Sequence, residues 1–264
     1  MRLQLIDTHC HLDVSDFDAD RAQVLTRARA AGVSAIVVPG IDAAGWDGLL
    51  GLCEGNSDLS PRLYPALGLH PVYLQRHCDA DLAALEQALE EPRVGHRPVA
   101  VGEIGLDFHD PALDPDRQRD LCAAQLAIAR NLRLPVLLHV RKAHEDMLRL
   151  LRDANVVGGI AHAFNGSLEQ ARRYLDLGFK LGFGGMLTFE RSSRLRRLAR
   201  ELPIEAIVLE TDAPDLTVAS HRFERNSPEY LPEVLAALAQ VRDGAPEQVA
   251  AQTTANARAV LGLN

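Results

Sequence analysis

Residues 3–11 have the sequence Leu3-Gln4-Leu5-Ile6-Asp7-Thr8-His9-Cys10-His11, in which a short apolar run leads directly into acidic and histidine side chains. A continuous apolar run is typical of a parallel strand that is buried on both faces. The same order of apolar run and polar turn recurs along the chain. The eight apolar runs are Leu3–Ile6, Ala35–Val38, Leu63–Leu69, Val99–Ile104, Pro135–Val140, Gly159–Ala163, Phe179–Phe183 and Ala206–Leu209.

Stretches with helical periodicity separate these runs. A helix is expected over Asp18–Ala31, with Gly32 as its stop. Further helices are expected over Gly45–Cys53, Asp79–Glu91, Pro115–Asn131, Ala143–Asp153, Ser167–Leu177, Arg191–Glu201 and Pro246–Leu261. Another helix is expected to begin at Pro228, with Ser227 as its cap.

This alternation predicts an α/β protein whose single domain, residues 1–264, is a (β/α)8 TIM-type barrel. Eight strand–helix alternations in 264 residues fit such a barrel better than an open, doubly wound sheet. The open sheet remains an alternative, because the number of strands does not prove that the first and the last strand meet.

The composition is that of an ordinary globular protein, with 47% hydrophobic and 24% charged residues. The apolar runs are too short to span a bilayer, so we expect no membrane segment, and nothing indicates an obligate protein partner. None of the 4 cysteines forms a CxxC pair, which favours reduced thiols and a cytoplasmic location. The net charge of -8 argues against a broad basic surface for nucleic acid, but not against a small anionic substrate at a metal site.

Polar residues follow several of the apolar runs, and in a barrel these strand ends converge on one face. The candidates are His9, His11, His70, Glu103, His139, His162 and Asp212. In an extended strand, His9 and His11 share a side and Cys10 points away, so the two imidazoles suit one metal ion and the thiol does not. A lone buried histidine is more often a hydrogen-bonded core residue, but here the coincidence would have to recur on several strands.

Glu103 lies inside an apolar run, where an unpaired carboxylate would be costly. Its two oxygens can bridge two cations, and His139 and His162 could complete a second site. The alternative for Glu103 is an internal ion pair with an arginine. Asp212 could bind a metal ion, carry a proton or do both, or it could be a cap or turn residue ahead of Pro214. Imidazole and carboxylate ligands suit Zn, Mn, Fe, Co or Ni, and carboxylates also accept Mg.

Two residues are candidates for substrate contacts. His70 could donate a hydrogen bond to a scissile phosphate, or it could stabilise the loop ahead of Pro71. Arg141 follows His139 and could contact an anionic substrate, or it could begin a solvated helix. The glycine-rich segments Gly102–Gly105 and Gly182–Gly185 match no phosphate-binding loop.

Taken together, these residues resemble the TatD family of metal-dependent deoxyribonucleases, within the amidohydrolase-like metal-dependent hydrolases. The resemblance covers nearly the whole chain. The matching segments are Asp7–Asp13, Gly68–Pro71, Val101–Asp107, Leu134–Val136 with His139 and Arg141, and Glu210–Pro214, and further matching positions are Gln118, Gln125, Arg225, Asn226, Pro228 and Asn256.

The resemblance implies a TIM-type barrel with two divalent metal ions, such as Mg, Mn or Zn. It implies His9, His11, Glu103 and Asp212 as ligands of one ion, and Glu103, His139 and His162 as ligands of the other. The implied reaction is hydrolysis of DNA phosphodiester bonds by a metal-activated water, with Asp212 and Glu103 as catalytic carboxylates. A 3′–5′ exonuclease that acts on single strands or accessible 3′ ends is expected.

The sequence departs from the family pattern around the mouth of the expected site. Ala163 stands where a cysteine is common, Val140 where a serine is common, and Ser227 where a glutamate is frequent. These departures leave the substrate preference open. The same metal centre could instead hydrolyse a small-molecule ester, amide or lactone. A third hypothesis is a non-catalytic barrel that binds metal or a protein partner.

Overall fold

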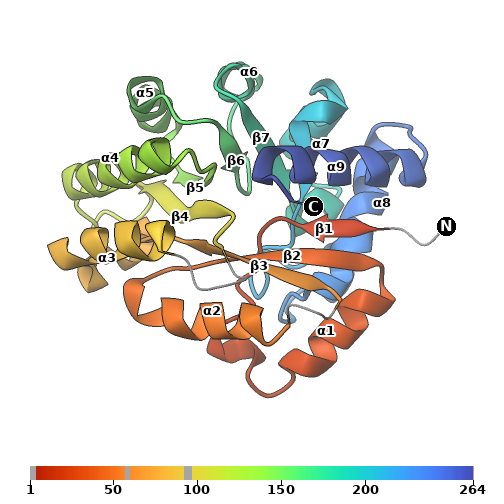
Figure 1. The fold of residues 1–264 in the computed structure, drawn as a ribbon. Coiled ribbons are helices and arrows are strands. Elements are labelled where there is room, and N and C mark those ends of the chain that lie inside the picture. Colours follow the sequence, from red (N-terminus) through yellow and green to blue (C-terminus); the bar gives the residue numbers. More distant parts are fainter. Residues whose placement is uncertain (1–3, 57–59, 92–96, 264) are drawn as a thin grey trace.

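The computed structural model describes residues 4–56, 60–91 and 97–263. These residues include eight strands that form one parallel sheet in sequence order (Figure 1). The strands are β1 (Leu5–Asp7), β2 (Val33–Pro39), β3 (Arg62–Leu67), β4 (Ala100–Asp107), β5 (Val136–Arg141), β6 (Gly159–Ala161), β7 (Phe179–Phe183) and β8 (Ile207–Leu209). Each overlaps one predicted apolar run, although Leu3, at the start of the first run, lies outside the described residues. All neighbouring strands are parallel, as their continuous apolar character predicts.

The barrel closes where the ends of β1 and β8, and the segments that follow them, meet. The N–H group and the hydroxyl group of Thr8 both donate to the carbonyl oxygen of Leu209, at 3.0 and 3.1 Å. Farther along the same two segments, the N–H group of Asp212 donates to the carbonyl oxygen of His9 at 2.8 Å. The predicted (β/α)8 barrel is therefore confirmed, and the open sheet is excluded.

Helices alternate with the strands and surround them (Figure 1). They are α1 (Arg21–Ala30), α2 (Trp46–Glu54), α3 (Asp79–Glu90), α4 (Pro115–Leu132), α5 (His144–Ala154), α6 (Leu168–Asp176), α7 (Ser193–Glu201), α8 (Leu231–Val241) and α9 (Pro246–Leu261). Within the described ranges, no helix is both long enough and apolar enough to cross a membrane.

Helical backbone begins at Pro228, as predicted, but its first turn is not α-helical and the predicted side-chain cap is wrong. Pro228 begins a short 3-10 turn, and α8 itself starts at Leu231. Ser227 makes no capping bond with its side chain. Instead, its N–H group donates to the side-chain oxygen of Asn226 at 2.8 Å, which turns the chain before the helix begins.

Two apolar layers lie on either side of the barrel wall. The larger layer packs the strands against the surrounding helices. The inner layer consists of residues from the strands, namely Ile6, Ala35, Val37, Ala66, Ala100, Leu137, Ile160 and Val208. Ala257 and Leu261 of α9 belong to the same inner cluster, so the last helix seals the end of the barrel at which the strands begin. Full burial of one leucine side chain stabilises a fold by about 1.5–3 kcal/mol, so this seal contributes measurably to stability.

Candidate metal centre

The polar residues that the sequence singled out meet at the opposite end of the barrel, where the strands finish. Glu103 lies in β4 and His139 in β5. The others lie in the segments that follow a strand, namely His9 and His11 after β1, His70 after β3, His162 after β6 and Asp212 after β8. The fold therefore brings together residues from six strand ends, as the barrel geometry predicts.

His9 and His11 lie beyond the end of β1, which finishes at Asp7. The prediction that they share the face of a strand is therefore wrong in its detail. Cys10 between them forms a parallel bridge with Ala213 and is fully buried in the apolar core. This pairing holds the segment in place, so the two imidazoles still point to one site while Cys10 packs elsewhere.

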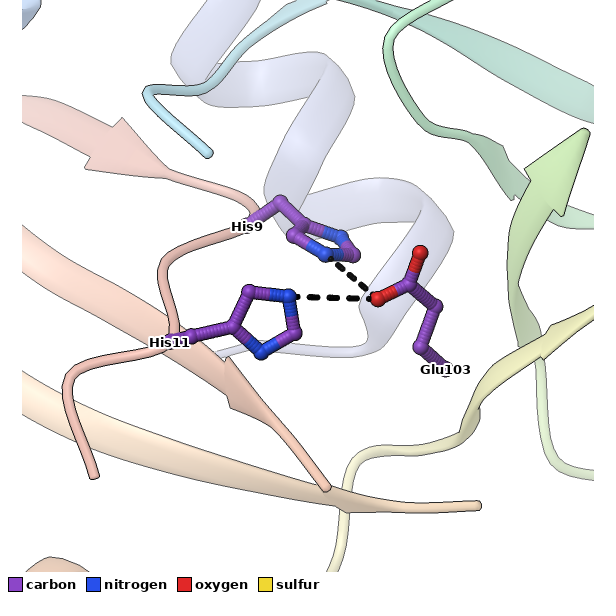
Figure 2. Close-up of side chains that lie close together, drawn as sticks. All are labelled: His9, His11 and Glu103. Carbon is purple, nitrogen blue, oxygen red and sulfur yellow. Dashed lines mark hydrogen bonds and ion pairs between the residues drawn. The ribbon is translucent and has the colours of Figure 1, made fainter. Parts of the chain in front are cut away.

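The carboxylate of Glu103 is at the centre of the site and is only 1% exposed. Nε2 of His9 lies 3.1 Å from its Oε2 atom, and Nε2 of His11 lies 3.2 Å from the same atom (Figure 2). Among the described residues, its ion-pair partners are all histidines, so the alternative of an internal pair between Glu103 and an arginine is wrong.

The second oxygen of Glu103 faces a different set of imidazoles. Its Oε1 atom lies 3.0 Å from Nδ1 of His139, 3.2 Å from Nε2 of His70 and 3.8 Å from Nε2 of His162. The two oxygens of one carboxylate thus point to two groups of nitrogen donors. This is the arrangement that a carboxylate needs in order to bridge two cations.

Asp212 adds a second carboxylate to the cluster. Its Oδ1 atom lies 3.8 to 3.9 Å from Nε2 of three histidines, His9, His11 and His162. Its backbone is left-handed, with a φ of 59°, and its carbonyl oxygen accepts the N–H group of Asp215 at 2.9 Å. Asp212 is therefore a turn residue, as one alternative predicts, and its side chain also faces the histidines. Metal binding or proton transfer by Asp212 stays a prediction.

Two of the histidines are held by the ring nitrogen that faces away from Glu103. Nδ1 of His11 lies 3.3 Å from the carbonyl oxygen of Pro39. Nε2 of His139 lies 2.9 Å from Oδ2 of Asp107. When this outer nitrogen carries the proton, the inner nitrogen keeps its lone pair, which is the usual state of a histidine that binds a metal ion.

Glu210 plays the corresponding role for His162. Its Oε1 atom lies 3.2 Å from Nδ1 of His162 and accepts the N–H group of Ala163 at 2.6 Å. Gly182 of β7 leaves room for this carboxylate, because a Cβ atom there would lie 2.1 Å from Oε2 of Glu210. No role was predicted from the sequence for Glu210 or Asp107. Their position directly at a strand end is the signal that could have identified them.

His70 is arranged as a hydrogen-bond donor. Its Nδ1 atom accepts the N–H group of Val72 at 3.1 Å, so the ring proton sits on Nε2. That N–H group points at Oε1 of Glu103, 3.2 Å away. Burial lowers the pKa of His70 to about 4, which keeps the ring neutral at pH 7. His70 can therefore donate to a carboxylate or phosphate oxygen, but it offers no lone pair at Nε2.

The crowding of carboxylates and imidazoles shifts their pKa values. Burial alone would raise the pKa of Glu103, but the surrounding imidazoles hold it well below its usual range. Burial alone would lower the pKa of His11, but its hydrogen bond with Glu103 raises it to about 9. Burial acts on His162 in the same way, and the charge of Asp212 raises its pKa to about 10. Protonated imidazoles thus supply the positive charge that the buried carboxylates need when no metal ion is bound.

The donor set fits divalent cations. Three groups of side chains have nitrogen or oxygen atoms within 4.8 Å of one another: His9, His11 and Glu103; His9, His162 and Asp212; and His70, Glu103 and His139. In the third group His70 contributes an N–H group and not a lone pair. The mixture of imidazole and carboxylate donors is the one that Zn, Mn and related ions prefer. A cation at either side of Glu103 would replace the protons that balance its charge in the metal-free protein.

Amide side chains of α4 fix the backbone near the site. Gln118 accepts the N–H group of Asp107 at 2.7 Å and donates to its carbonyl oxygen at 2.8 Å. Gln125 does the same for Leu69, at 2.7 and 3.1 Å. One helix therefore positions both the end of β4 and the segment that carries His70.

A second set of bonds joins the segments after β1 and β8. Oδ1 of Asp7 accepts the N–H group of Thr211 at 2.9 Å, and Oδ2 accepts the hydroxyl group of Thr211 at 2.6 Å. Asn226 donates to the carbonyl oxygens of Thr211 and Asp215, at 2.8 and 2.7 Å. These bonds fix the segment that carries Asp212.

Arg141 lies at the edge of this cluster rather than within it. Its side chain is exposed at the end of β5. It lines a cavity that is also lined by His139, His162 and Asp212. A contact between Arg141 and a substrate therefore stays a prediction.

The whole sequence is similar to known metal-dependent hydrolases. It matches the family described as TatD related DNase over residues 6–262. It is 40% identical over 251 residues to the uncharacterized metal-dependent hydrolase YjjV of Escherichia coli, with 95% of each chain covered. It is 34% identical over 267 residues to the 3′-5′ ssDNA/RNA exonuclease TatD of Klebsiella pneumoniae, with 98% of each chain covered.

The fold is also shared with a solved structure. The crystal structure of YjjV, a TatD homolog from Escherichia coli, matches with a TM-score of 0.94 and 37% sequence identity. The match covers 100% of both chains. The similarity therefore extends over the complete barrel and is not limited to the strand ends that carry the polar cluster.

Proposed function

The chain belongs to the TatD family of metal-dependent hydrolases, and from this premise we propose that it hydrolyses phosphodiester bonds of DNA at single-stranded or accessible 3′ ends. The observation that carries the proposal is the buried carboxylate of Glu103, whose two oxygens face two sets of imidazoles. Paired cations suit phosphodiester hydrolysis, because they stabilise charge on the attacking and the leaving oxygen. The name of the Klebsiella pneumoniae relative, a 3′-5′ ssDNA/RNA exonuclease, supports this choice of substrate.

The proposal includes two divalent ions per chain. His9, His11, Glu103 and Asp212 would hold one ion, and Glu103, His139 and His162 would hold the other. Bound ions would lower the pKa of a water molecule and neutralise charge on the phosphoryl oxygens. Mg, Mn and Zn are all compatible with these donors.

Asp212 is the group that would accept a proton from the attacking water. Burial raises its pKa to about 6, against the charges of His162 and His11, which lower it. A bound cation would lower this pKa further, so the carboxylate would be ionised and able to accept a proton, and its position beside His9, His11 and His162 supports the role of base. Glu103 has a different role. Its low pKa keeps its carboxylate ionised, and the ionised carboxylate orients the surrounding imidazoles.

His70 and Arg141 would contact the substrate directly. The N–H group at Nε2 of His70 points into the cluster and can donate to a phosphoryl oxygen in place of Glu103. Arg141 is exposed at the edge of the cavity, where its guanidinium group can reach an anionic part of the substrate. Neither residue would supply a lone pair to a metal ion.

A small-molecule ester, amide or lactone is the second candidate substrate. The net charge of -8 disfavours the approach of a long polyanion. The cavity beside the cluster has a volume of about 740 Å³, which is typical of sites that bind small ligands. The family assignment removes the third hypothesis, a non-catalytic barrel, because the relatives are metal-dependent hydrolases.

The test is cleavage of a single-stranded and a 3′-recessed oligonucleotide by metal-free protein that is titrated with Mg, Mn and Zn. We expect metal-dependent shortening from the 3′ end. His9→Ala and Asp212→Asn should each lower turnover by about 1,000-fold or more, because metal ligation stabilises the transition state by several kcal/mol. Asp176→Asn, at the exposed end of α6, is the control and should keep wild-type turnover.

Two outcomes would contradict the proposal. Wild-type turnover in His9→Ala and Asp212→Asn, with metal present, would remove the metal centre from the reaction. A protein that binds two metal equivalents and cleaves a small ester, but shortens neither oligonucleotide, would make the small-molecule hydrolase the better assignment.

A further inference from the structure

A cavity of about 740 Å³ connects the metal centre with the beginning of α7. His139, His162 and Asp212 line its inner end. Arg191 and Arg194 line its outer end, just before α7 and in its first turn. The roles proposed above involve the inner end and Arg141 at the edge, so the outer end has a function still to be explained.

Exposed cations gather along the rim of the cavity. Arg141, Arg191 and Arg194 all line the cavity with exposed side chains. In the part of the chain that the structure describes, none of these guanidinium groups forms an ion pair. Asp215 is an exposed carboxylate on the same rim, and the other carboxylates of the cavity face the histidines. Three guanidinium groups against one free carboxylate give this rim a positive charge.

The two arginines near α7 are held in different ways. Nη2 of Arg194 donates to the carbonyl oxygen of Asn165 at 2.8 Å, which fixes its guanidinium group at the rim. The guanidinium group of Arg191 lies over the ring of Phe189, 5.4 Å from the ring centroid. A planar guanidinium group that is already oriented can bind a phosphate through two parallel hydrogen bonds.

An apolar wall lies in the same cavity as these cations. Phe164, Met186, Leu195 and Leu216 line it, and Leu216 is 41% exposed. A ligand that contacts both walls needs an anionic group and a flat or apolar group, and a nucleotide has both. Sites for small ligands measure roughly 300–1,000 Å³, so the cavity suits a nucleotide unit of a single strand rather than a duplex.

We propose that this cavity binds the nucleotide unit next to the scissile bond, and that Arg191 and Arg194 contact a second phosphate group of the substrate. This inference rests on the proposed function, which provides the scissile phosphodiester at the metal centre. The metal ions would already neutralise that phosphate, so additional guanidinium groups in the same cavity suit another anionic group. The substrate class is therefore a single-stranded nucleic acid or a nucleotide with at least two phosphates, rather than an isolated phosphodiester.

The first test compares two substrates of the metal-loaded protein. One is a single-stranded oligonucleotide, and the other is bis(p-nitrophenyl) phosphate, which has no second phosphate. Combining Arg191→Gln with Arg194→Gln should lower kcat/KM for the oligonucleotide by about 10- to 100-fold, mainly through KM, because charge-assisted hydrogen bonds are lost. The value for bis(p-nitrophenyl) phosphate should stay within about two-fold of wild type.

Arg197→Gln is the matched control. Arg197 lies on the same helix, is 74% exposed and pairs with Glu201 rather than lining the cavity. This substitution removes one positive charge from α7 without changing the rim. Both substrates should therefore be cleaved as in the wild type.

The second test measures binding and does not depend on turnover. Calorimetry should show that thymidine 3′,5′-bisphosphate binds the wild type about 10-fold or more tightly than thymidine 5′-monophosphate. Arg191→Gln alone should remove this preference. The single variant preserves the bond between Arg194 and Asn165, so it separates phosphate recognition from support of the loop.

Several results would overturn the inference. Equal losses on both substrates would show that the arginines only support the fold, and an unchanged KM for the oligonucleotide would show that they do not contact it. If the wild type cleaves no oligonucleotide, the proposed function fails and the binding experiment alone decides. A preference for the bisphosphate that is lost in Arg191→Gln then supports the contact between these arginines and a second phosphate, and equal binding of the two nucleotides overturns it.

Discussion

The two ends of the barrel are built from the same eight strands but have opposite chemistry. At the end where the strands begin, Ile6, Val37 and Leu137 meet Leu261 of α9 in an apolar cluster. At the other end, Glu103 is buried among histidines. Apolar burial stabilises the first end, whereas the second end costs free energy because charged groups are removed from water. Stability and chemistry are therefore separated along the axis of the barrel.

Leu261→Ala should weaken the apolar end and leave the polar end unchanged. Leu261 is 4% exposed, and removal of a buried leucine side chain lowers the free energy of unfolding by about 2–5 kcal/mol. Denaturant unfolding followed by circular dichroism measures this loss. Val157→Ala, at a side chain that is 58% exposed, is the control and should change stability by less than about 0.5 kcal/mol.

The same variant tests whether the polar end works independently of the apolar end. The kcat/KM of Leu261→Ala should equal the wild-type value at a temperature where the variant is folded. A reduced kcat/KM of Leu261→Ala at a temperature where it is fully folded would show that the two ends are coupled.

Asp107→Asn should weaken the polar end only. Asp107 holds the outer nitrogen of His139, and loss of such a partner typically lowers metal affinity by about 10- to 100-fold. The asparagine side chain keeps the oxygen that accepts the N–H group of His109, so the backbone turn is preserved. Competition with a chelating dye measures the affinity for each metal equivalent.

Asp110→Asn is the control for this prediction, since Asp110 is an exposed carboxylate in the same connection. It should bind metal as the wild type does. Unchanged affinity in Asp107→Asn would mean that the orientation of His139 is determined by other contacts.

Metal binding should release protons from the polar end. The pKa of His11 is raised to about 9 and that of His162 to about 10. At pH 7 in the metal-free protein both imidazoles are therefore positively charged, with a proton on each ring nitrogen. Each must lose the proton on Nε2 before this atom can bind a cation. Calorimetry in buffers with different ionisation enthalpies should show proton release at pH 7 that disappears above about pH 10. Binding at pH 7 without proton release would contradict the assignment of these two ligands.

These pKa shifts also give the metal-free fold a pH dependence. Unfolded histidines titrate near pH 6.5, so the folded protein holds the protons of His11 and His162 more tightly than the unfolded chain does. Their contribution to stability is fully present below about pH 6.5 and is lost as the pH rises through about 9 to 10. Saturating metal should abolish this loss, because cations take the place of the protons.

The strands and the polar residues at their ends could be predicted from the sequence, because short local patterns of apolar and polar residues determine them. Continuous apolar runs indicate buried parallel strands, and a barrel brings their ends together. His139, His162 and Asp212 could therefore be assigned to one face. The details of β1 could not be predicted in the same way. This strand ends at Asp7, and the residues after it are held by a bridge between Cys10 and a neighbouring segment.

The partners of these residues depend on contacts that no local pattern encodes. Asp107 and Glu210 stand at strand ends, in positions where a ligand could also stand, and only the folded chain places them against outer ring nitrogens. Gln118 matches a family pattern, but its bonds with the backbone of β4 result from the packing of α4. Arg191 reaches the cavity through the course of the connection between β7 and α7. Long-range placement of the backbone decides all of these contacts.

The position of α9 in the chain also determines when the barrel can be completed during translation. It packs against β1 and β8, and Asn256 donates to the carbonyl oxygens of Ile204 and Ile207, at 2.8 and 2.7 Å. The ribosome releases β1 first among these elements, and β8 and α9 last. Until then β1 and β7 are open edges that are prone to aggregation, and His9 lacks its neighbour Asp212. A nascent chain therefore has no assembled site until β8 and α9 have left the ribosome.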